Sequence, residues 1–205
     1  MENRVITIAR SYGSGGRKMG RLLAKELGYE YYDREILRIA SDESGISEEL
    51  FRQADEKQRI PLFRIAREVY TGEVIPPDSD DFISNENLFR YQAKIIRELA
   101  ATRNCVIVGR CADYVLNDRD DVVSVFILGD TDARIKCLEQ RQGLDEAQAR
   151  KKIKEVDKDR SSFYKYYSDQ TWGDAQNYDL CINSSKLGVE GTVQTILSYI
   201  KARGL

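Results

Sequence analysis

The chain has 205 residues, of which 32% are charged and 41% are hydrophobic, and its formal net charge is −2. This length fits one domain, or one core with inserts, and the small net charge argues against a general nucleic-acid or membrane-surface binder. Because no window approaches about 18 uncharged apolar residues and the N-terminus lacks a secretory signal, we expect a cytoplasmic protein.

The chemistry open to the chain is limited by its lack of histidine. Histidine metal sites, Ser-His-Asp triads and Cys-His dyads are therefore excluded. The four cysteines have no C-x-x-C spacing, so we expect reduced thiols rather than a disulfide framework or a zinc site.

The first predicted element is a β-branched strand, Val5–Ala9, that leads into the turn Gly13-Ser14-Gly15-Gly16 and then into a helix over Arg17–Leu27. Glycines let backbone amides face an anion without obstruction from a Cβ, and the helix adds free N–H groups and its positive dipole end. Arg17 and Lys18 add positive side-chain charge. This order predicts that residues 13–18 bind phosphate; the alternative is a turn that binds nothing.

The turn departs from the Walker A pattern G-x-x-x-x-G-K-[ST]. With Gly16 as the second glycine, Ser11 stands at the first glycine, Arg17 at the lysine and Lys18 at the magnesium-binding hydroxyl. The charge at the lysine position is kept, but a planar guanidinium is bulkier and aimed differently than an ammonium.

Apolar runs and helical patterns then alternate along the chain, as expected of an α/β protein with a parallel sheet covered by helices. Beyond the first strand, further strands are predicted over Glu30–Tyr32, Cys105–Val108, Val122–Leu128 and Leu180–Asn183. Further helices are predicted over Asn85–Ala101, Asp132–Arg141, Glu146 to about Tyr167, and Val189–Arg203. Asp130 and Ser184 are candidates to cap the helices that follow them.

Two polar segments interrupt this alternation. Residues 41–84 contain all three prolines and the acidic loop Asp78-Ser79-Asp80-Asp81, and residues 141–174 are dense in charge. In a phosphoryl-transfer enzyme such inserts can form an acceptor-binding flap and a closing lid. Charge alone favours the simpler interpretation, a solvated surface helix.

Four motifs in order resemble the cytidylate kinase-like branch of the P-loop nucleoside monophosphate kinases. They are Gly-Ser-Gly-Gly-Arg with its helix, Tyr31-Tyr32-Asp33, Val106-Ile107-Val108-Gly109-Arg110 and Asp157-Lys158-Asp159-Arg160. The resemblance spans nearly the whole chain, although residues 41–84 match only in place and polarity. It implies a P-loop NTPase fold with a five-stranded parallel sheet flanked by helices, and with acceptor-binding and lid helical inserts.

The resemblance also implies a domain plan. Residues 1–205 would form one P-loop kinase domain, with a core in residues 1–40, 85–140 and 175–205. The acceptor-binding insert would be residues 41–84, and the lid residues 141–174.

Site residues follow from the same resemblance. In such kinases the loop holds the β and γ phosphates of the donor, which places Ser14, Gly15, Gly16 and Arg17 on ATP. Asp33 occupies the position that faces the acceptor nucleotide, with an ordinary turn residue at the strand end as the alternative. Arg110 matches the arginine that contacts the monophosphate, at a strand end where open α/β sheets bind ligands.

In the lid, Arg160 is the arginine that we expect to neutralise the transferred phosphoryl group. Asp157 lies three residues earlier on the same helix face and is expected to orient it; the alternative is a surface ion pair. Nearby aromatic residues either pack the lid or stack on a base, and packing is favoured: Tyr164, Tyr166, Tyr167 and Trp172.

One departure from the family weakens the metal site. Where cytidylate kinases read Asp-Gly-Arg-Asp, this chain reads Val108-Gly109-Arg110-Cys111 and so lacks two carboxylates. Asp113 is the candidate to replace the one that serves the acceptor. We assign no metal ligand, because Mg²⁺ can rely on water and the nucleotide phosphates.

The predicted activity is transfer of a phosphoryl group from ATP to a nucleoside monophosphate, CMP or dCMP in our interpretation, with Arg17, Arg160 and Asp157 as catalytic residues. Two alternatives stay open: a kinase of another small acceptor, and a non-catalytic nucleotide-binding sensor. Nucleotides and Mg²⁺ are the expected partners, without nucleic-acid polymers or membranes, and the chain is compatible with a homodimer.

Overall fold

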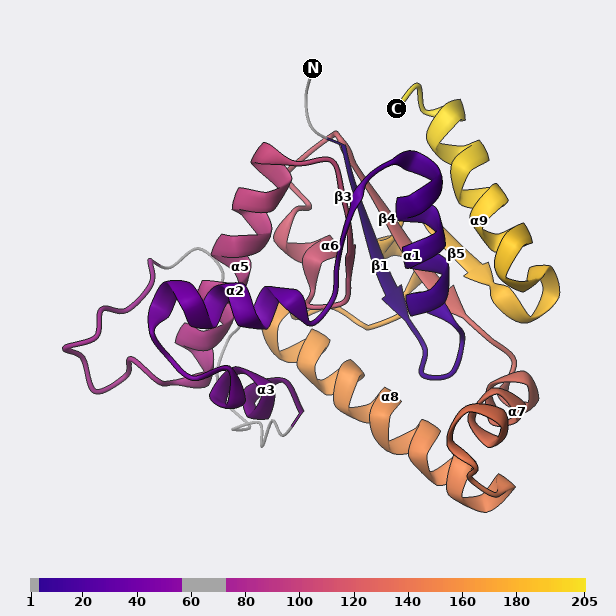
Figure 1. Cartoon of the computed structure of the whole chain (residues 1–205), viewed down its shortest axis with the longest axis horizontal. Coiled ribbons are helices and arrows are strands. Elements are labelled where there is room, and N and C mark those ends of the chain that lie inside the picture. The colour runs from indigo at the N-terminus through magenta and orange to yellow at the C-terminus, as the bar shows by residue number, and fades with distance from the viewer. Residues whose placement is uncertain (1–3, 57–72) are drawn as a thin grey trace.

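The computed structural model describes residues 4–56 and 73–205, which form a five-stranded parallel sheet with helices on both faces (Figure 1). The spatial order of the strands is β2-β3-β1-β4-β5. Their bounds are Val5–Arg10 for β1, Glu30–Tyr32 for β2, Cys105–Val108 for β3, Val122–Leu128 for β4 and Leu180–Asn183 for β5. The predicted α/β class and all five strands are confirmed, with one end differing by a residue.

The predicted helices are also present, and others lie in the polar insert and after β3. Their bounds are Gly16–Leu27 (α1), Glu35–Ser44 (α2), Glu48–Glu56 (α3), Asn85–Thr102 (α5), Ala112–Val115 (α6), Thr131–Gln142 (α7), Glu146–Ser168 (α8) and Ser184–Ala202 (α9). In the described part of the chain, no helix combines the length and apolar character needed to span a membrane.

The start of α9 differs from the prediction. The helix begins at Ser184 rather than Val189, because a kink at Gly188, where φ is 67°, joins two helical pieces. Ser184 is not the capping residue: Asn183 occupies that position, and its side chain accepts from the amide of Ser185. Asp130 does precede α7, but its carboxylate makes no capping bond and instead accepts from Asn183.

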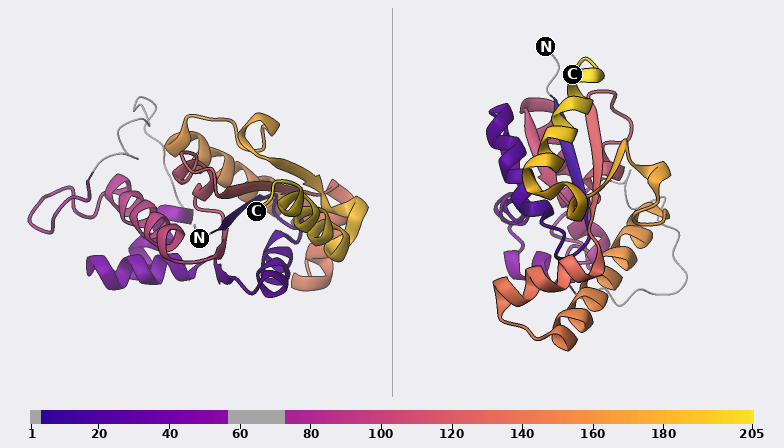
Figure 2. Two further views of the ribbon diagram at one scale, coloured as in Figure 1. Left: turned by 90° about the horizontal axis from the view of Figure 1, so that it is seen from above. Right: turned by 90° about the vertical axis from the view of Figure 1, so that its right-hand side faces the viewer.

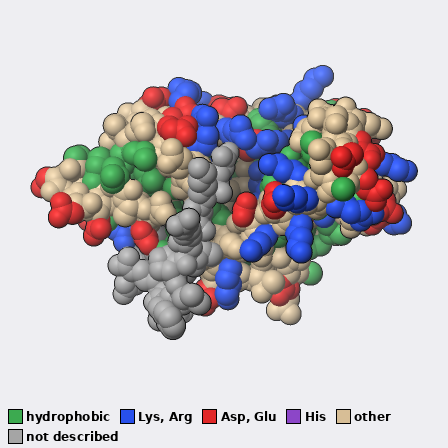
Figure 3. Space-filling model, turned by 90° about the horizontal axis from the view of Figure 1, so that it is seen from below, with side chains coloured by type: hydrophobic (Ala, Val, Ile, Leu, Met, Phe, Trp, Pro, Cys, Tyr) green, Lys and Arg blue, Asp and Glu red, His purple; other side chains and the backbone are tan. Residues whose placement is uncertain are grey.

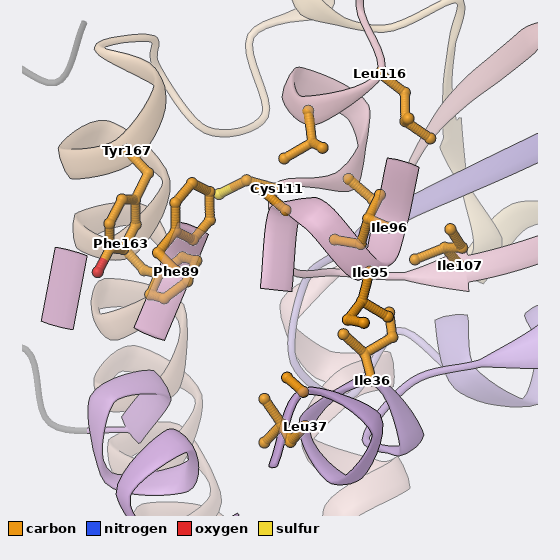
Figure 4. Packing of buried hydrophobic residues seen from close by; sticks show 14 of the residues in the cluster. Ile36, Leu37, Phe89, Ile95, Ile96, Ile107, Cys111, Leu116, Phe163 and Tyr167 are labelled. Atoms are coloured by element: carbon orange, nitrogen blue, oxygen red, sulfur yellow. The ribbon is translucent and has the colours of Figure 1, made fainter. Parts of the chain in front are cut away.

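The two faces of the sheet follow from the alternation of side chains along each strand. Ile6 and Ile8 point to the face covered by α1 and α9. Val5 and Ala9 point to the opposite face, which is covered by α5, α6 and the C-terminal half of α8 (Figure 2). Figure 4 shows the second core, with Ile95 and Ile96 of α5 beside Ile107 of β3.

The aromatic run of α8 belongs to this second core. Tyr167 stacks on Phe89 of α5 with ring centroids 3.9 Å apart, and Phe163 meets Phe89 edge to face at 6.0 Å (Figure 4). These contacts confirm packing as the role of Tyr167. The C-terminal half of α8 is therefore anchored to the body of the protein rather than free to swing.

The other half of α8 packs differently. A separate small cluster joins it to α7, made of Ile135, Leu138, Ala149 and Ile153. The unit formed by α7 and the start of α8 thus begins ten residues before the expected lid boundary at 141. At the other insert, α2 crosses the expected boundary at residue 41, and residues 57–72 of that insert lie outside the described structure.

Replacing Phe89 by alanine tests the packing of α8 on the core. We expect a loss of about 3–5 kcal/mol of unfolding free energy, because Phe89 is 1% exposed and supports both aromatic contacts. Urea denaturation measures it, with Ile83→Ala as the control: Ile83 is 58% exposed and should change stability by less than about 0.5 kcal/mol. Equal effects of the two substitutions would contradict this packing.

Candidate active site

The glycine loop, residues 13–18, connects β1 to α1 in an open conformation. Gly13 and Gly15 have φ angles of 82° and 83°, which side-chain-bearing residues rarely adopt, and Gly15 is the N-cap of α1. Within the described residues, the amides of Gly13 and of residues 15–18 donate to no protein acceptor. The loop thus presents free N–H groups at a helix N-terminus, the arrangement that binds anions.

Two hydroxyl groups, those of Ser14 and Ser184, stabilise the loop through bonds to backbone carbonyls. Ser14 donates its hydroxyl to the carbonyl of Ser11 at 2.9 Å. Ser184 Oγ lies 2.9 Å from the carbonyl oxygens of both Ser14 and Leu128, which ties the loop to β4 and α9. These bonds support the loop without using the free amides of Gly13 and of residues 15–18.

Next to the loop, the carboxyl ends of the strands open onto a cavity of about 590 Å³. Figure 3 views the protein from this side and shows lysine and arginine side chains gathered around its middle. Among the described residues, the charged side chains lining the cavity are Arg10, Arg17, Arg34, Arg110, Lys152, Arg160, Asp113 and Asp159. Six cations against two carboxylates favour an anionic ligand.

Arg17 and Asp33 form an ion pair at the mouth of this cavity. Arg17 Nε lies 2.6 Å from Asp33 Oδ2, and its Nη2 donates to Oδ1 at 3.4 Å. Asp33 is 5% exposed, and Arg10 Nη2 lies 3.9 Å from the same carboxylate. The candidate donor-side arginine and the candidate acceptor-side carboxylate are thus joined to each other.

Arg110 enters the cavity from a strained turn after β3. Gly109, Arg110 and Cys111 have φ angles of 82°, 63° and 52°, so two residues with side chains adopt the left-handed conformation in succession. Such strain costs on the order of 1–3 kcal/mol per residue and is typical of functional sites. The turn directs the buried Arg110 side chain to the cavity wall.

An ion pair between α7 and α8 holds Tyr12, the residue just before the glycine loop. Asp157 accepts from the amide of Tyr12 at 2.7 Å, and Arg134 donates its Nε to the carbonyl of Tyr12 at 2.7 Å. Arg134 and Asp157 also pair with each other. The carboxylate of Asp157 thus has Arg134 and the Tyr12 amide as partners, because α7 lies against α8 at that position, and its expected role in orienting Arg160 stays a prediction.

Arg160 does reach the loop, by a different route. Its Nη1 donates to the carbonyl of Arg10 at 2.9 Å, and its guanidinium carbon lies 5.5 Å from the ring centroid of Tyr12. Both contacts hold the guanidinium over the end of β1 and at the cavity wall. Lys18, in contrast, is exposed on α1 and does not line the cavity.

Asp113 is a buried carboxyl group on the opposite wall. The Tyr164 hydroxyl donates to Asp113 Oδ2 at 2.7 Å, and burial raises the pKa of Asp113 to about 6. Tyr164 is itself buried, and this desolvation, followed by the nearby Asp113, raises the pKa of its hydroxyl far above the ordinary value. Asp113 is poised to change charge near neutral pH, with Tyr164 holding its orientation.

In the part of the chain that the structure describes, no group of side chains forms a ready magnesium site. Within the described ranges, no three acidic or cysteine side chains gather as a metal-binding group. Asp33 is occupied by Arg17, Asp113 by Tyr164, and neither Arg17 nor Lys18 can ligate a cation. A magnesium ion that arrives with a nucleotide can be held largely by the phosphates and by water.

Sequence patterns missed several cations that the structure brings to this site, among them Arg10 and Arg134. Arg10 had a usable signal, since it ends β1 as Arg110 follows β3, and Ile8 pairs with Val108 in the parallel register. Arg134 had none, because its contact with the loop depends on how α7 packs.

The chain is similar in sequence to known proteins over most of its length. A sequence model of the cytidylate kinase-like family matches residues 5–186. A cytidylate kinase of Archaeoglobus fulgidus is 25% identical over 206 residues, which covers 97% of this chain and 95% of that protein.

Two solved structures share the fold. An uncharacterized protein from Eubacterium ventriosum gives a TM-score of 0.71 at 28% identity, with 97% of this chain and 99% of that chain covered. A shikimate kinase from Bacteroides thetaiotaomicron gives a TM-score of 0.55 at 14% identity, covering 97% and 98% of the two chains. The second likeness shows the fold alone, which is that of the P-loop kinases.

The raised pKa of Asp113 predicts a specific pH dependence of stability. Because the native state holds this proton more tightly than the unfolded state, ionisation of Asp113 lowers the unfolding free energy as pH rises from about 4 to about 6. The loss is on the order of 2–3 kcal/mol. Asp113→Asn should flatten the profile in that window and be more stable than the parent at pH 7, as measured by urea denaturation.

The exposed Asp120, changed to asparagine, is the control, and should leave the profile unchanged. A profile for Asp113→Asn as steep as that of the parent protein would contradict the buried, raised carboxyl group.

The contacts of Asp157 with Tyr12 and Arg134 predict that Asp157→Asn loosens the start of the glycine loop. Loss of the charge leaves the largely buried Arg134 without its ionic partner, so we expect a loss of about 1–3 kcal/mol and faster hydrogen exchange at Tyr12. Exchange measured by mass spectrometry, beside urea denaturation, tests both. Glu155→Gln, which breaks an exposed pair with Lys151 on the same helix, should cost less than about 1 kcal/mol. Unchanged exchange at the loop in Asp157→Asn would show that the contacts of Asp157 do not hold it.

Proposed function

We propose a specific function from one premise: this chain belongs to the cytidylate kinase-like family and is a P-loop phosphotransferase that acts on a nucleotide or another small molecule. The proposed reaction transfers the γ-phosphoryl group of ATP to a nucleoside monophosphate, CMP or dCMP. The observation that carries the proposal is the cavity between the glycine loop and the Arg110 turn, whose lining has a clear excess of positive charge.

The donor triphosphate would bind at the glycine loop. The free amides of Gly13 and of residues 15–18 support this assignment, together with the dipole of α1 behind them. Arg17 would add charge at the mouth of the cavity, and the exposed Lys18 would act only at long range. ATP is the donor implied by the family, and Mg²⁺ would arrive with its phosphates.

The acceptor would bind at the opposite wall. Arg110 would contact the monophosphate through two parallel hydrogen bonds, and its left-handed turn and its position in the cavity lining support this role. Asp113 would orient the rest of the acceptor. Asp33 would contribute indirectly, by holding the guanidinium of Arg17 between the two phosphate groups.

Arg160 would neutralise charge on the transferred phosphoryl group. It already lies over the end of β1, between the loop and the lid helix, through its bond to the Arg10 carbonyl. Asp157 would act as a positioning residue that keeps the loop against α8. No general base is required, because the attacking atom is an ionised phosphate oxygen, and the work of the protein is alignment and charge stabilisation.

A kinase assay tests this function directly. Purified protein is given ATP and Mg²⁺, with CMP, dCMP, UMP and AMP added singly, and ADP formation is measured against a reaction without acceptor. We expect ADP to appear only with an acceptor and fastest with CMP or dCMP. Binding of ATP without transfer to any of the four would contradict the proposal and favour a sensor or another acceptor.

The variants Arg110→Ala and Arg160→Ala should differ in which kinetic parameter each one changes. Arg110→Ala should chiefly raise KM for the acceptor, because a monophosphate carries its charge already in the ground state. Arg160→Ala should chiefly lower kcat, by a factor of about 100, because its contact strengthens as charge redistributes in the transition state. Steady-state kinetics separate the two effects, and a pure KM effect in both variants would remove Arg160 from the catalytic role.

A further inference from the structure

Arg10, the last residue of β1, has a side chain that fills the space left by two glycines. A Cβ on Gly16 would lie 2.7 Å from Cβ and 2.9 Å from Cγ of Arg10, and a Cβ on Gly109 would collide with the Arg10 guanidinium. Gly16 starts a regular helix and its φ is not in the left-handed region, so its backbone does not need glycine. The need for glycine at position 16 comes from Arg10.

This contact gives a second way to place the Walker A letters on the chain. With Gly15, the N-cap of α1, as the second glycine, Arg10 falls at the first glycine and Gly16 at the lysine. The cation and the glycine have then exchanged places, and the two exchanged residues touch in the structure. The exchange accounts for two of the three departures in this register, and the third is Arg17 at the hydroxyl position. The register through Gly16 leaves Ser11, Arg17 and Lys18 as three unrelated changes.

The surroundings of Arg10 favour the binding of an anion next to its guanidinium. Its side chain is 14% exposed, and its Nε is buried without a hydrogen-bond partner among the described residues. Asp33 is the carboxylate that supports it, at 3.9 Å. Burial and like-charged neighbours lower the pKa of Arg10 to about 9; these neighbours are Arg160, Arg17 and Arg110.

We propose that Arg10 is the phosphate-binding cation of the glycine loop and takes the place of the P-loop lysine on the donor triphosphate. The inference rests on the proposed function, and it names a residue that the Walker pattern alone leaves out. Arg17, whose guanidinium is already bound on two sides by Asp33, supplements Arg10 from the mouth of the cavity.

Calorimetric titration with ATP and, separately, with inorganic triphosphate tests this role. Arg10→Gln should weaken the binding of both by about 10- to 100-fold, the loss of a charge-assisted hydrogen-bonding group. Arg38→Gln is the matched control, because Arg38 lies exposed on α2 and should leave both affinities unchanged.

Two further variants test the role of Arg10 without relying on the folding of Arg10→Gln; the second of them moves the positive charge to another position. Arg10→Gly removes the cation, and Arg10→Gly combined with Gly16→Lys returns it at the Walker position, where the space is now open. The double variant should bind inorganic triphosphate at least about tenfold more tightly than Arg10→Gly. Circular dichroism melting confirms that the compared proteins are folded.

The outcomes separate this inference from the proposed function. If folded Arg10→Gln binds both ligands like the parent, or the double variant gains nothing over Arg10→Gly, the inference is overturned even where phosphoryl transfer is observed. If no transfer occurs but inorganic triphosphate binds in an Arg10-dependent way, the proposed function fails and the role of Arg10 stands.

Discussion

Six cationic side chains converge on one cavity at the carboxyl edge of the sheet, and holding them there is the constraint that shapes the site. Mutual repulsion and burial oppose this arrangement, as the lowered pKa of Arg10 shows. The fold compensates by packing: both faces of the sheet are covered by apolar clusters that fix the strand ends. Asp33 offsets part of the charge, and a phosphate ligand would offset the rest.

The same packing couples α7 and α8 to the start of the glycine loop. Tyr12 is held at its amide by Asp157 and at its carbonyl by Arg134, so α7 and α8 contact the loop through its backbone. Arg160 adds a bond to the carbonyl of Arg10. Through these contacts, a change in loop conformation on phosphate binding would directly shift α7 and α8. The stacking of Tyr167 on Phe89 of α5 anchors the other end of α8.

The sheet could be predicted from sequence because its strands are short apolar runs between polar turns, and Cys105–Val108 matches at both ends. The glycine loop could be located because its glycines stand between a strand and a helix. Partners across helices could not: the spacing of Asp157 and Arg160 suggests a pair on one face, yet Arg134 from α7 takes the carboxylate. Arg10 escapes the Walker pattern because its relation to Gly16 exists only in three dimensions.

A crystal structure with a non-hydrolysable ATP analogue and CMP tests the central claim most directly, because it locates both phosphate groups against the arginines. The account predicts the β and γ phosphates within hydrogen-bonding distance of the free amides of Gly13 and of residues 15–18 and of the Arg10 guanidinium, with the acceptor phosphate on Arg110. An analogue bound elsewhere, with these amides and Arg10 untouched, would contradict it.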